Sequence, residues 1–465
     1  MTARSGRSWC WVVLGVAGLL LIAMGVVADS AGLMETRGSW WRLGFTLPGH
    51  VVLLYSWWRL GPSPARPMRI IGIWAASVAL VVPLHSRDAY SYAAQGWLMA
   101  RGLDPYVVAS GEAGAPGLLV GMHWSQTTSV YPPGSLAIFA AVSRLTGGDL
   151  LWTPIAMRLP NLVALAVVAW CLVWLSRRFG LAPGPVLWWG LANPVVIVQW
   201  VGGIHNDAVM VAVVALAFVA AVRWPGWAGF LVSGALIGLA VSIKQSAAVA
   251  GVGAVALAWA ATAASAGGGS WRSLGCRAAA AGAAAVGVFT AITVGSGLGL
   301  GWRNPTAGSP LGASSNAPIS WVGSLLRGFG IGSGAMLTDV LTIISGVLVV
   351  VAVAWVVWRW GPRPPERLGR PWPVAVFSLA AFALLGPGLQ PWYITWALPF
   401  VALARPSGGW ARAWLLAVGA ASLLAPLQDV VAPYIAMALL AVPAVVWWRR
   451  ESCLGAASAT SRMWA

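Results

Sequence analysis

Long apolar runs separated by short polar turns are the feature that most limits how this chain can fold. A helix needs about 20 mainly apolar residues to cross the hydrocarbon core of a bilayer. Such runs begin near residues 9, 45, 69, 155, 182, 207, 227, 246, 276, 335, 372, 391, 410 and 431. We therefore expect one all-α integral-membrane domain over residues 1–465, folded as a multi-pass bundle. Because several runs are short or interrupted by proline, the expected number of transmembrane helices is about 12–14. The stretch 261–287, rich in Ala, Gly and Ser, is interpreted as a small-residue linker that runs into a closely packed helix.

The composition excludes the main soluble classes. Only 8% of the residues are charged, against about 25% in soluble domains. The formal net charge of +17 therefore has too little polar surface to indicate nucleic-acid binding, and the 32 tryptophans suit belts at the two membrane surfaces. The four cysteines are scattered without the spacing of a zinc site, a redox motif or a disulfide framework.

The distribution of charge predicts the orientation in the plasma membrane. With a cytoplasmic N-terminus, most of the basic residues fall in alternate loops, whereas only Glu366 and Glu451 of the 11 acidic residues do so. This pattern predicts cytoplasmic N- and C-termini, an even number of spans and an extracytoplasmic site. The first run resembles a signal peptide, but its length and the many later runs favour a retained span.

Two long loops are expected on the outer side, at residues 85–154 and 299–334. Loops longer than about 15 residues are usually functional. In the first loop, residues 88–100 are expected to form a helix with Asp88 as its N-cap, and residues 134–147 a second helix lying in the membrane interface. Gly, Pro, Ser and Asn crowd the second loop, which suits a mobile lid.

Two acidic positions stand out on the outer side. Asp88 is either a cap and interfacial charge, or the general base of an active site at the membrane surface. His205, Asn206 and Asp207 follow two glycines at the start of the sixth span. A helix N-terminus explains Asp207 but not three consecutive polar groups, so we interpret them as ligand contacts. A metal site is not favoured, because no second cluster of ligands accompanies them.

The isolated cations and the aromatic residues also have two interpretations. Lys244 is the only lysine among 28 basic residues and ends the seventh span. A lysine at membrane depth is normally paired or functional, and its compact ammonium suits a phosphate, although near the interface it can simply snorkel. Arg303 is a second phosphate ligand or a solvated loop residue. Trp392 and Tyr393 belong to an interfacial belt or stack on a sugar ring.

Together these groups suit a substrate with a lipid tail, a phosphate at the interface and a sugar beyond it. The cation would stabilise charge on a leaving phosphate, and the carboxylate would take the proton of an attacking hydroxyl. A transporter or flippase of a polyprenyl-linked glycan is the first alternative, and it would place charges mid-bilayer, often between internal repeats. A non-catalytic scaffold is the second.

Three motifs carry a resemblance to a known family. The run 87–96 with the run 102–106 is similar to the first outer loop of the polyprenol-phosphate-mannose-dependent α-1,6-mannosyltransferases, the MptA/MptB type of the GT-C glycosyltransferase superfamily. Asn193-Pro194 with residues 202–207 resembles a second signature, and residues 390–393 a third. One departure is Tyr131-Pro-Pro-Gly, where the family has Tyr-Gly-Pro, and this departure bears on the choice of acceptor.

The resemblance implies a GT-C-like bundle whose first long outer loop is catalytic. It implies inverting transfer of mannose from β-linked polyprenyl phosphate to a mannan or lipoglycan acceptor, as in lipomannan and lipoarabinomannan assembly. An α-1,6 linkage is expected, without a nucleotide donor, and another polyprenyl-phosphate sugar such as arabinose is the alternative. No cofactor or metal is expected, and neither is nucleic acid as a partner.

The resemblance and the residues together give the predicted site. Asp88 is the expected base, with Asp207 as its rival, and Lys244 and Arg303 are the expected ligands of the donor phosphate. The predicted sugar or acceptor contacts are Arg87, Tyr92, His205, Asn206, Asp207, Gln245, Gln390, Trp392 and Tyr393.

Overall fold

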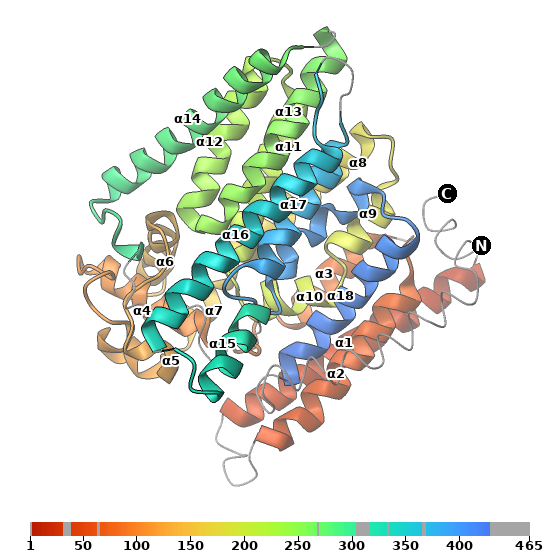
Figure 1. The fold of residues 1–465 in the computed structure, drawn as a ribbon. Coiled ribbons are helices and arrows are strands. Elements are labelled where there is room, and N and C mark those ends of the chain that lie inside the picture. Colours follow the sequence, from red (N-terminus) through yellow and green to blue (C-terminus); the bar gives the residue numbers. More distant parts are fainter. Residues whose placement is uncertain are drawn as a thin grey trace.

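The chain folds as an all-helical membrane protein. The computed structural model describes residues 2–30, 39–62, 66–266, 269–303, 317–332, 334–364 and 369–427, and these contain helices but no β-strand (Figure 1). Six helical segments are long and apolar enough to cross a membrane: Ser8–Ala28, Trp152–Arg178, Gln245–Ser265, Trp271–Ser296, Gly334–Trp360 and Gly408–Leu427. If the pair Pro194–Gly202 and Asp207–Arg223, which is bent by 117°, is taken as one span, the number of candidate spans rises to seven. The protein is therefore an integral membrane protein, as the sequence predicts.

Several apolar runs do not form continuous full-length spans, so the described residues contain six or seven candidate spans beside the 12–14 expected for the whole sequence. The run near 391 folds into two pieces of 3-10 helix, η7 (Tyr393–Trp396) and η8 (Leu398–Ala404). The run near 182 gives only α9 (Pro183–Gly190) before the turn at Asn193-Pro194. Proline lacks an N–H and clashes with the preceding turn, so an α-helix does not continue through these segments.

Other runs form helices shorter than a full span. These are α3 (Pro67–Ser77), α12 (Trp227–Ile243) and α17 (Pro371–Leu385). The run near 431 lies outside the described residues.

The helices run up and down in a bundle. α1 (Thr2–Ser30) pairs with α2 (Ser39–Leu60) at one edge, and α12 lies beside α14 (Trp271–Ser296) at the opposite edge (Figure 1). Between these edges lie α8 (Arg158–Arg178), α11 (Asp207–Arg223), α13 (Ala250–Ala266), α16 (Gly334–Trp360) and α18 (Gly408–Leu427).

Small residues bring α12 and α14 into backbone contact. A Cβ atom at Gly234 would lie 2.2 Å from the carbonyl oxygen of Ala281, and one at Gly238 would lie 2.1 Å from that of Ala285. The predicted close packing of the Ala-rich stretch is therefore confirmed. The predicted linker is wrong, because α13 continues to Ala266 and α14 begins at Trp271, as strong helix propensity of alanine allows.

The first long loop is itself a folded layer at one end of the bundle. Its main helices, α4 (Asp88–Ala100) and α6 (Pro133–Leu145), lie close to the predicted bounds. They touch at Gly96, where a Cβ atom would lie 2.3 Å from the carbonyl oxygen of Phe139. α6 also rests on the bundle, because Ser135 Oγ donates to the carbonyl oxygen of Ile243 at 2.7 Å.

The second long loop is partly helical. It contains the short η5 (Gly301–Arg303) and α15 (Pro318–Gly328), and α15 packs on α16 through Ile319 and Leu326. Residues 304–316 of the loop expected to form a mobile lid lie outside the described residues.

A buried arginine holds the segment before α4 against the bend before α11. Arg158, at the start of α8, donates to the carbonyl oxygens of Val201 at 2.6 Å, Ala79 at 2.6 Å and Val81 at 2.7 Å. These carbonyls lie outside regular helices or at helix ends, where they need a donor. The bend therefore has a fixed shape, and residues 203–207 project from it to the same end of the bundle as α4.

Candidate active site at the end of the bundle

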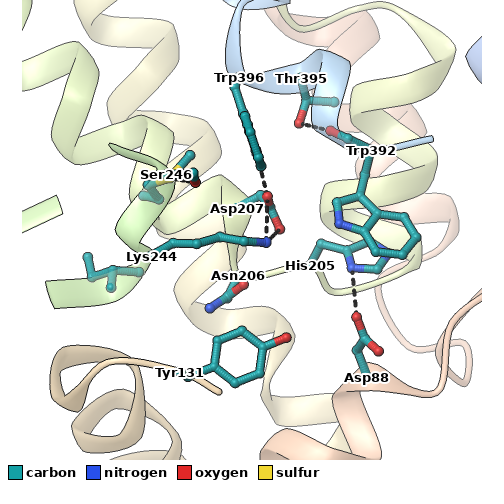
Figure 2. Close-up of polar contacts among 12 residues, drawn as sticks. Asp88, Tyr131, His205, Asn206, Asp207, Lys244, Ser246, Trp392, Thr395 and Trp396 are labelled. Atoms are coloured by element: carbon teal, nitrogen blue, oxygen red, sulfur yellow. Dashed lines mark hydrogen bonds and ion pairs between the residues drawn. The ribbon is translucent and has the colours of Figure 1, made fainter. Parts of the chain in front are cut away.

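Side chains far apart in the sequence gather where α4, the bend before α11, the end of α12 and the segment after α17 meet. Figure 2 shows Asp88, His205, Asp207, Lys244 and Trp392 in this cluster. Residues from each of the three motifs therefore meet at one site.

Asp88 presents a partly exposed carboxylate. It is the first residue of α4, and its side chain is 13% exposed. Trp124, in the short helix α5 (Met122–Ser125), donates its indole N–H to Asp88 Oδ1 at 3.1 Å. His205 Nδ1 lies 3.4 Å from Asp88 Oδ2 (Figure 2).

Asp88 is not the helix cap that the sequence predicted. Arg87 occupies the N-cap position without a side-chain capping bond, and Ser86 Oγ accepts the hydrogen bond of the Asp88 N–H at 3.1 Å. The carboxylate is directed to Trp124 and His205 instead. It is therefore held from two sides by groups outside its own helix.

These neighbours keep Asp88 ionised. Burial alone would raise the pKa of its carboxyl group, but the contact with His205, the charge of Lys244 and the hydrogen bond from Trp124 together lower the pKa below its ordinary value. Asp88 is therefore a carboxylate at neutral pH, which is the form that accepts a proton.

His205 is fixed by its surroundings. Its side chain is fully buried, and its ring stacks on Trp392 with centroids 3.7 Å apart and planes 15° apart. Its carbonyl oxygen accepts a hydrogen bond from Asn161 Nδ2 at 3.0 Å. The imidazole therefore has little freedom to turn away from Asp88.

Asp207 and Lys244 form a buried ion pair. Lys244 Nζ lies 2.8 Å from each carboxylate oxygen of Asp207, whose side chain is fully buried. The Trp396 indole N–H donates to the same carboxylate, and the ammonium lies 5.1 Å from the ring centroid of Tyr393. The pair forms because α11 begins at Asp207 and α12, which packs against it, ends just before Lys244.

Asn206 and Tyr92 have packing partners. Asn206 Nδ2 donates to Ser135 Oγ at 3.0 Å, and Asn206 lines a cavity of about 10 Å³, close to the space of one water molecule. Tyr92 is buried, stacks on Phe139 and accepts a hydrogen bond from the Tyr131 hydroxyl at 3.3 Å. Both residues therefore join α4 and α6 to the bundle beneath the cluster.

Four predicted site residues are not joined to the cluster by their side chains. Arg87, Gln245 and Arg303 are exposed, and Gln390 is half-buried. Among the described residues, no hydrogen bond or ion pair connects these four side chains to Asp88, Asp207 or Lys244. Arg303 follows Trp302, which packs on the aromatic cluster around Tyr92 and Tyr106.

Two tryptophans that contact the carboxylates, Trp124 and Trp396, are not among the predicted site residues. Trp396 lies four residues after Trp392. This spacing of aromatic residues is the feature of the sequence that could have indicated a role for Trp396. No motif near Trp124 in the sequence indicates a functional role, because its contact with Asp88 depends on how the whole first loop folds. Over the described part of the chain, no group of three or more His, Cys, Asp or Glu side chains is placed to hold a metal ion.

Comparison with known proteins gives a consistent set of relatives. The family model described as "Alpha-(1->6)-mannopyranosyltransferase, N-terminal domain" matches residues 12–261. Alpha-(1->6)-mannopyranosyltransferase A of Corynebacterium glutamicum is 35% identical over 181 residues, 38% of this chain and 36% of that protein. The B enzyme of the same species is 26% identical over 379 residues, 76% of this chain and 60% of that protein.

A mycobacterial relative extends this set. Alpha-(1->6)-mannopyranosyltransferase A of Mycobacterium tuberculosis is 31% identical over 261 residues, 51% of this chain and 49% of that protein. The matches therefore span 36% to 60% of the length of these three relatives. No solved structure matches the chain significantly. Because the family model covers more than half of the sequence, this chain belongs to the alpha-(1→6)-mannopyranosyltransferase family.

Proposed function

We propose that this protein transfers mannose from a polyprenyl-phosphate donor to a mannan or lipoglycan acceptor and forms an α-1,6 linkage on the extracytoplasmic face of the membrane. The observation that carries the proposal is the ionised, partly exposed carboxylate of Asp88, held by Trp124 and His205, in a chain of this family. No nucleotide or metal takes part in the proposed reaction.

Asp88 is the proposed general base. The acceptor hydroxyl oxygen attacks the anomeric carbon of the mannose and gives its proton to the Asp88 carboxylate. The bond between that carbon and the phosphate oxygen breaks, and polyprenyl phosphate leaves with the electron pair. One displacement on a β-linked donor inverts the anomeric carbon and gives the α-linkage.

Lys244 is the proposed ligand of the leaving phosphate. An ammonium group has three N–H donors, and the Asp207 oxygens accept from it at two points. The remaining donor is available to a phosphate oxygen, and its side chain is 13% exposed. The buried carboxylate of Asp207 holds the ammonium in place, and Arg303 on the neighbouring loop is a second proposed phosphate ligand.

The surroundings of the two carboxylates favour Asp88 over Asp207 as the base. Asp207 is fully buried, and Lys244 and Trp396 occupy its oxygens. Because its oxygens are already engaged by these neighbours, a structural and phosphate-positioning role suits Asp207 better.

Trp392 is the proposed platform for a sugar ring. One of its faces stacks on His205, and the side chain is only half-buried. An aromatic face that remains accessible suits a sugar ring. Gln390 and Tyr393 are neighbours of Trp392 in the chain, Gln245 follows Lys244 and Arg87 precedes Asp88. These four residues are further proposed sugar or acceptor contacts.

The proposed orientation of the protein in the membrane rests on the different residues at the two ends of the bundle. The cluster lies at the start of α11, whereas Arg223 ends this helix about 24 Å away. Arg178, at the end of α8, lines one pocket with Arg223. Basic residues favour the cytoplasmic side, so the cluster is assigned to the extracytoplasmic side.

Turnover by the purified protein tests the proposal. With labelled polyprenyl-phosphate-mannose and a short α-1,6-mannoside as acceptor, we expect an elongated α-1,6 product. Asp88→Asn should lower kcat by roughly a hundredfold or more while the donor still binds, since the amide cannot take the proton. Asp104→Asn is the matched control in the same loop, because an asparagine can still accept the hydrogen bond that Asp104 Oδ1 receives from the Tyr106 N–H.

Three results would contradict the proposal. Donor binding by the wild-type protein without any product would point to another acceptor, another donor or a carrier. Full activity of Asp88→Asn would remove the assigned base. Inactivity of Asp207→Asn alone, with a folded protein, would move the base to Asp207.

A further inference from the structure

A pocket lined by two arginines lies at the end of the bundle opposite the active-site cluster. It has a volume of about 410 Å³ and is bordered by the ends of α8, α11 and α13, of which α11 packs on both of the others. Arg178 is the last residue of α8, Arg223 is the last residue of α11, and both line the pocket. Two positive charges therefore share one cavity.

These arginines have no acidic partner in the described part of the chain. Neither side chain takes part in an ion pair or a hydrogen bond there. A third arginine, Arg405, lies nearby and donates to the carbonyl oxygen of Phe179, just after α8, at 2.8 Å. The described acidic side chains lie instead in the first loop, in the cluster or near the start of α16, and they are Asp88, Asp104, Glu112, Asp149, Asp207 and Asp339. The excess of positive charge at this end favours an anion.

The other walls of the pocket are mainly apolar. Trp174 lies one turn before Arg178, on the same face of α8, and is half-buried. On α13, Ala261 and Ala264 are three residues apart on one face, and their small side chains leave the cavity open. Such walls suit the glycerol and the first acyl carbons of a phospholipid better than a fully hydrated ion.

Exposed tryptophans indicate that the pocket lies at the level of the lipid headgroups. Trp224 follows Arg223 and is 44% exposed, and Trp227, at the start of α12, is 51% exposed. Arg277 of α14 lies over the Trp227 ring, 5.6 Å from its centroid. Tryptophan and arginine are enriched at this depth of a membrane. The phosphate groups of one leaflet are therefore close to the pocket.

Helix dipoles explain only part of this arrangement. The carbonyl end of a helix carries about half a negative charge and favours a basic residue, which accounts for one arginine at the end of each helix. It does not account for two arginines that line the same cavity, since like charges repel each other. An anion bound by both arginines would offset this repulsion.

We propose that this pocket binds the phosphate of an anionic phospholipid, with Arg178 and Arg223 as its ligands. A guanidinium group can donate two parallel hydrogen bonds to phosphate oxygens. Basic pockets between transmembrane helices on the cytoplasmic side, where the proposed orientation puts this end of the bundle, bind anionic headgroups. The site is separate from the donor site and does not depend on the transfer of mannose.

The bound lipid would join two helices that also build the cluster. α8 begins at Arg158, which holds the bend before α11, and α11 begins at Asp207. The pocket lies where these same helices end. We therefore expect the lipid to stabilise the folded bundle, because a ligand that binds only the folded state raises its stability.

Two adjacent arginines allow a matched test. Arg178 lines the pocket, whereas Arg177 does not, and both are exposed. Successive residues of a helix point about 100° apart. Arg178→Gln and Arg177→Gln therefore remove the same charge from the same helix end, but only Arg178→Gln removes a proposed ligand.

Native mass spectrometry of the purified protein in a neutral detergent measures the binding. The wild-type protein should bind phosphatidylglycerol in preference to phosphatidylcholine. Arg178→Gln and Arg223→Gln should each weaken the binding of phosphatidylglycerol by about fivefold, the effect of one basic residue near a membrane surface. Arg177→Gln should bind like the wild-type protein. Phosphatidylglycerol should also raise the midpoint of thermal unfolding of the wild-type protein more than that of the two pocket variants.

Three results would overturn the assignment. Equal binding of the two lipids would show that the pocket does not select an anion. Equal losses in Arg177→Gln and Arg178→Gln would assign the effect to the general charge of this surface. Competition by inorganic phosphate at the concentration of the lipid would indicate a site for a free anion instead.

A photoreactive phosphatidylglycerol at a near-stoichiometric amount tests the wild-type protein even where a pocket variant does not fold. Crosslinks are expected at the ends of α8, α11 and α13, and crosslinks confined to other parts of the bundle reject the site. None of these measurements involves mannose transfer, so their outcome is independent of the proposed function.

Discussion

At the scale of single residues, the cluster is built from two carboxylates with different neighbours. Asp88 has an indole and an imidazole beside it and remains partly exposed. Asp207 has an ammonium and an indole and is fully buried. The carboxylate of Asp88 therefore suits the proposed proton transfer, whereas that of Asp207 holds a cation.

Replacing His205 should shift the pH dependence of the reaction. His205 helps to lower the pKa of Asp88, so His205→Gln should raise that pKa. Because the base must be ionised, activity of the variant should be lost at a higher pH than in the wild-type protein as the pH falls. The acid limb of a pH profile of kcat/KM measures this shift.

Trp124→Phe provides the comparison for His205→Gln. Its indole hydrogen bond is the smallest of the influences that lower the pKa of Asp88. The acid limb should therefore move in the same direction but by less. An acid limb that stays in place in both variants would show that another group sets it, and Asp88 would lose its assignment as base.

The sequence identifies these residues one by one but not their partners. His205, Asp207 and Lys244 stand out because polar groups are rare in this chain. The pairing of Asp207 with Lys244 depends on α11 and α12 packing side by side, and the contact with Trp396 spans 189 positions. Hydrophobic periodicity and composition indicate local structure, so they do not predict contacts between residues that are far apart in the sequence.

At the scale of the helices, the position of Asp88 depends on how closely α4 approaches α6. Gly96 lies two turns after Asp88 and touches the backbone of Phe139. α6 is in turn fixed to the end of α12 by Ser135. The proposed base and the proposed phosphate ligand are therefore connected through two helix contacts.

Adding one methyl group at Gly96 should disturb this contact. The new Cβ atom of Gly96→Ala would lie 2.3 Å from a backbone oxygen, so the helices must separate. We expect a loss of about 1–3 kcal/mol in stability, typical of overpacking, and a fall in kcat. Thermal unfolding in detergent and the mannose-transfer assay measure the two effects.

Gly72→Ala on α3 is the control for this prediction. A Cβ atom at Gly72 meets nothing within 4 Å, and alanine is favoured over glycine in a helix by about 1 kcal/mol. This variant should be as stable as the wild-type protein or slightly more so. Equal stability and activity of the two variants would mean that α4 and α6 are not in tight contact.

The sequence predicts helices well where the apolar runs are uninterrupted, and less well at breaks. α4 has the predicted bounds although Asp88 is not its cap, and α14 contains the apolar run near 276 but begins earlier, inside the stretch predicted as a linker. The run near 391 has the hydropathy of a span, but hydropathy alone does not reveal that it folds into η7 and η8. The 117° bend before α11 depends on carbonyl groups held by Arg158, which is a tertiary contact.

At the scale of the whole molecule, the two ends of the bundle differ in chemistry. One end carries the cluster and the folded first loop, and the other carries arginines at the ends of α8 and α11. This asymmetry suits a protein whose substrate is reached from one side of the membrane.

Cysteine labelling in intact cells should detect this asymmetry. In a variant without the four native cysteines, Leu118→Cys in the first loop should react with a membrane-impermeant maleimide, because Leu118 is 83% exposed. Trp271→Cys, at the start of α14 and 61% exposed, should react only after the membrane is opened. The reverse pattern would invert the assigned orientation.

The buried ion pair also has a consequence for how the protein is made. Asp207 is synthesised 37 residues before Lys244 and 189 residues before Trp396. At about 5–20 residues per second, its carboxylate waits about 2–7 s for the ammonium and about 9–38 s for the indole. The ion pair can therefore form only after residue 244 has been synthesised, and the site is complete only after residue 396 has followed.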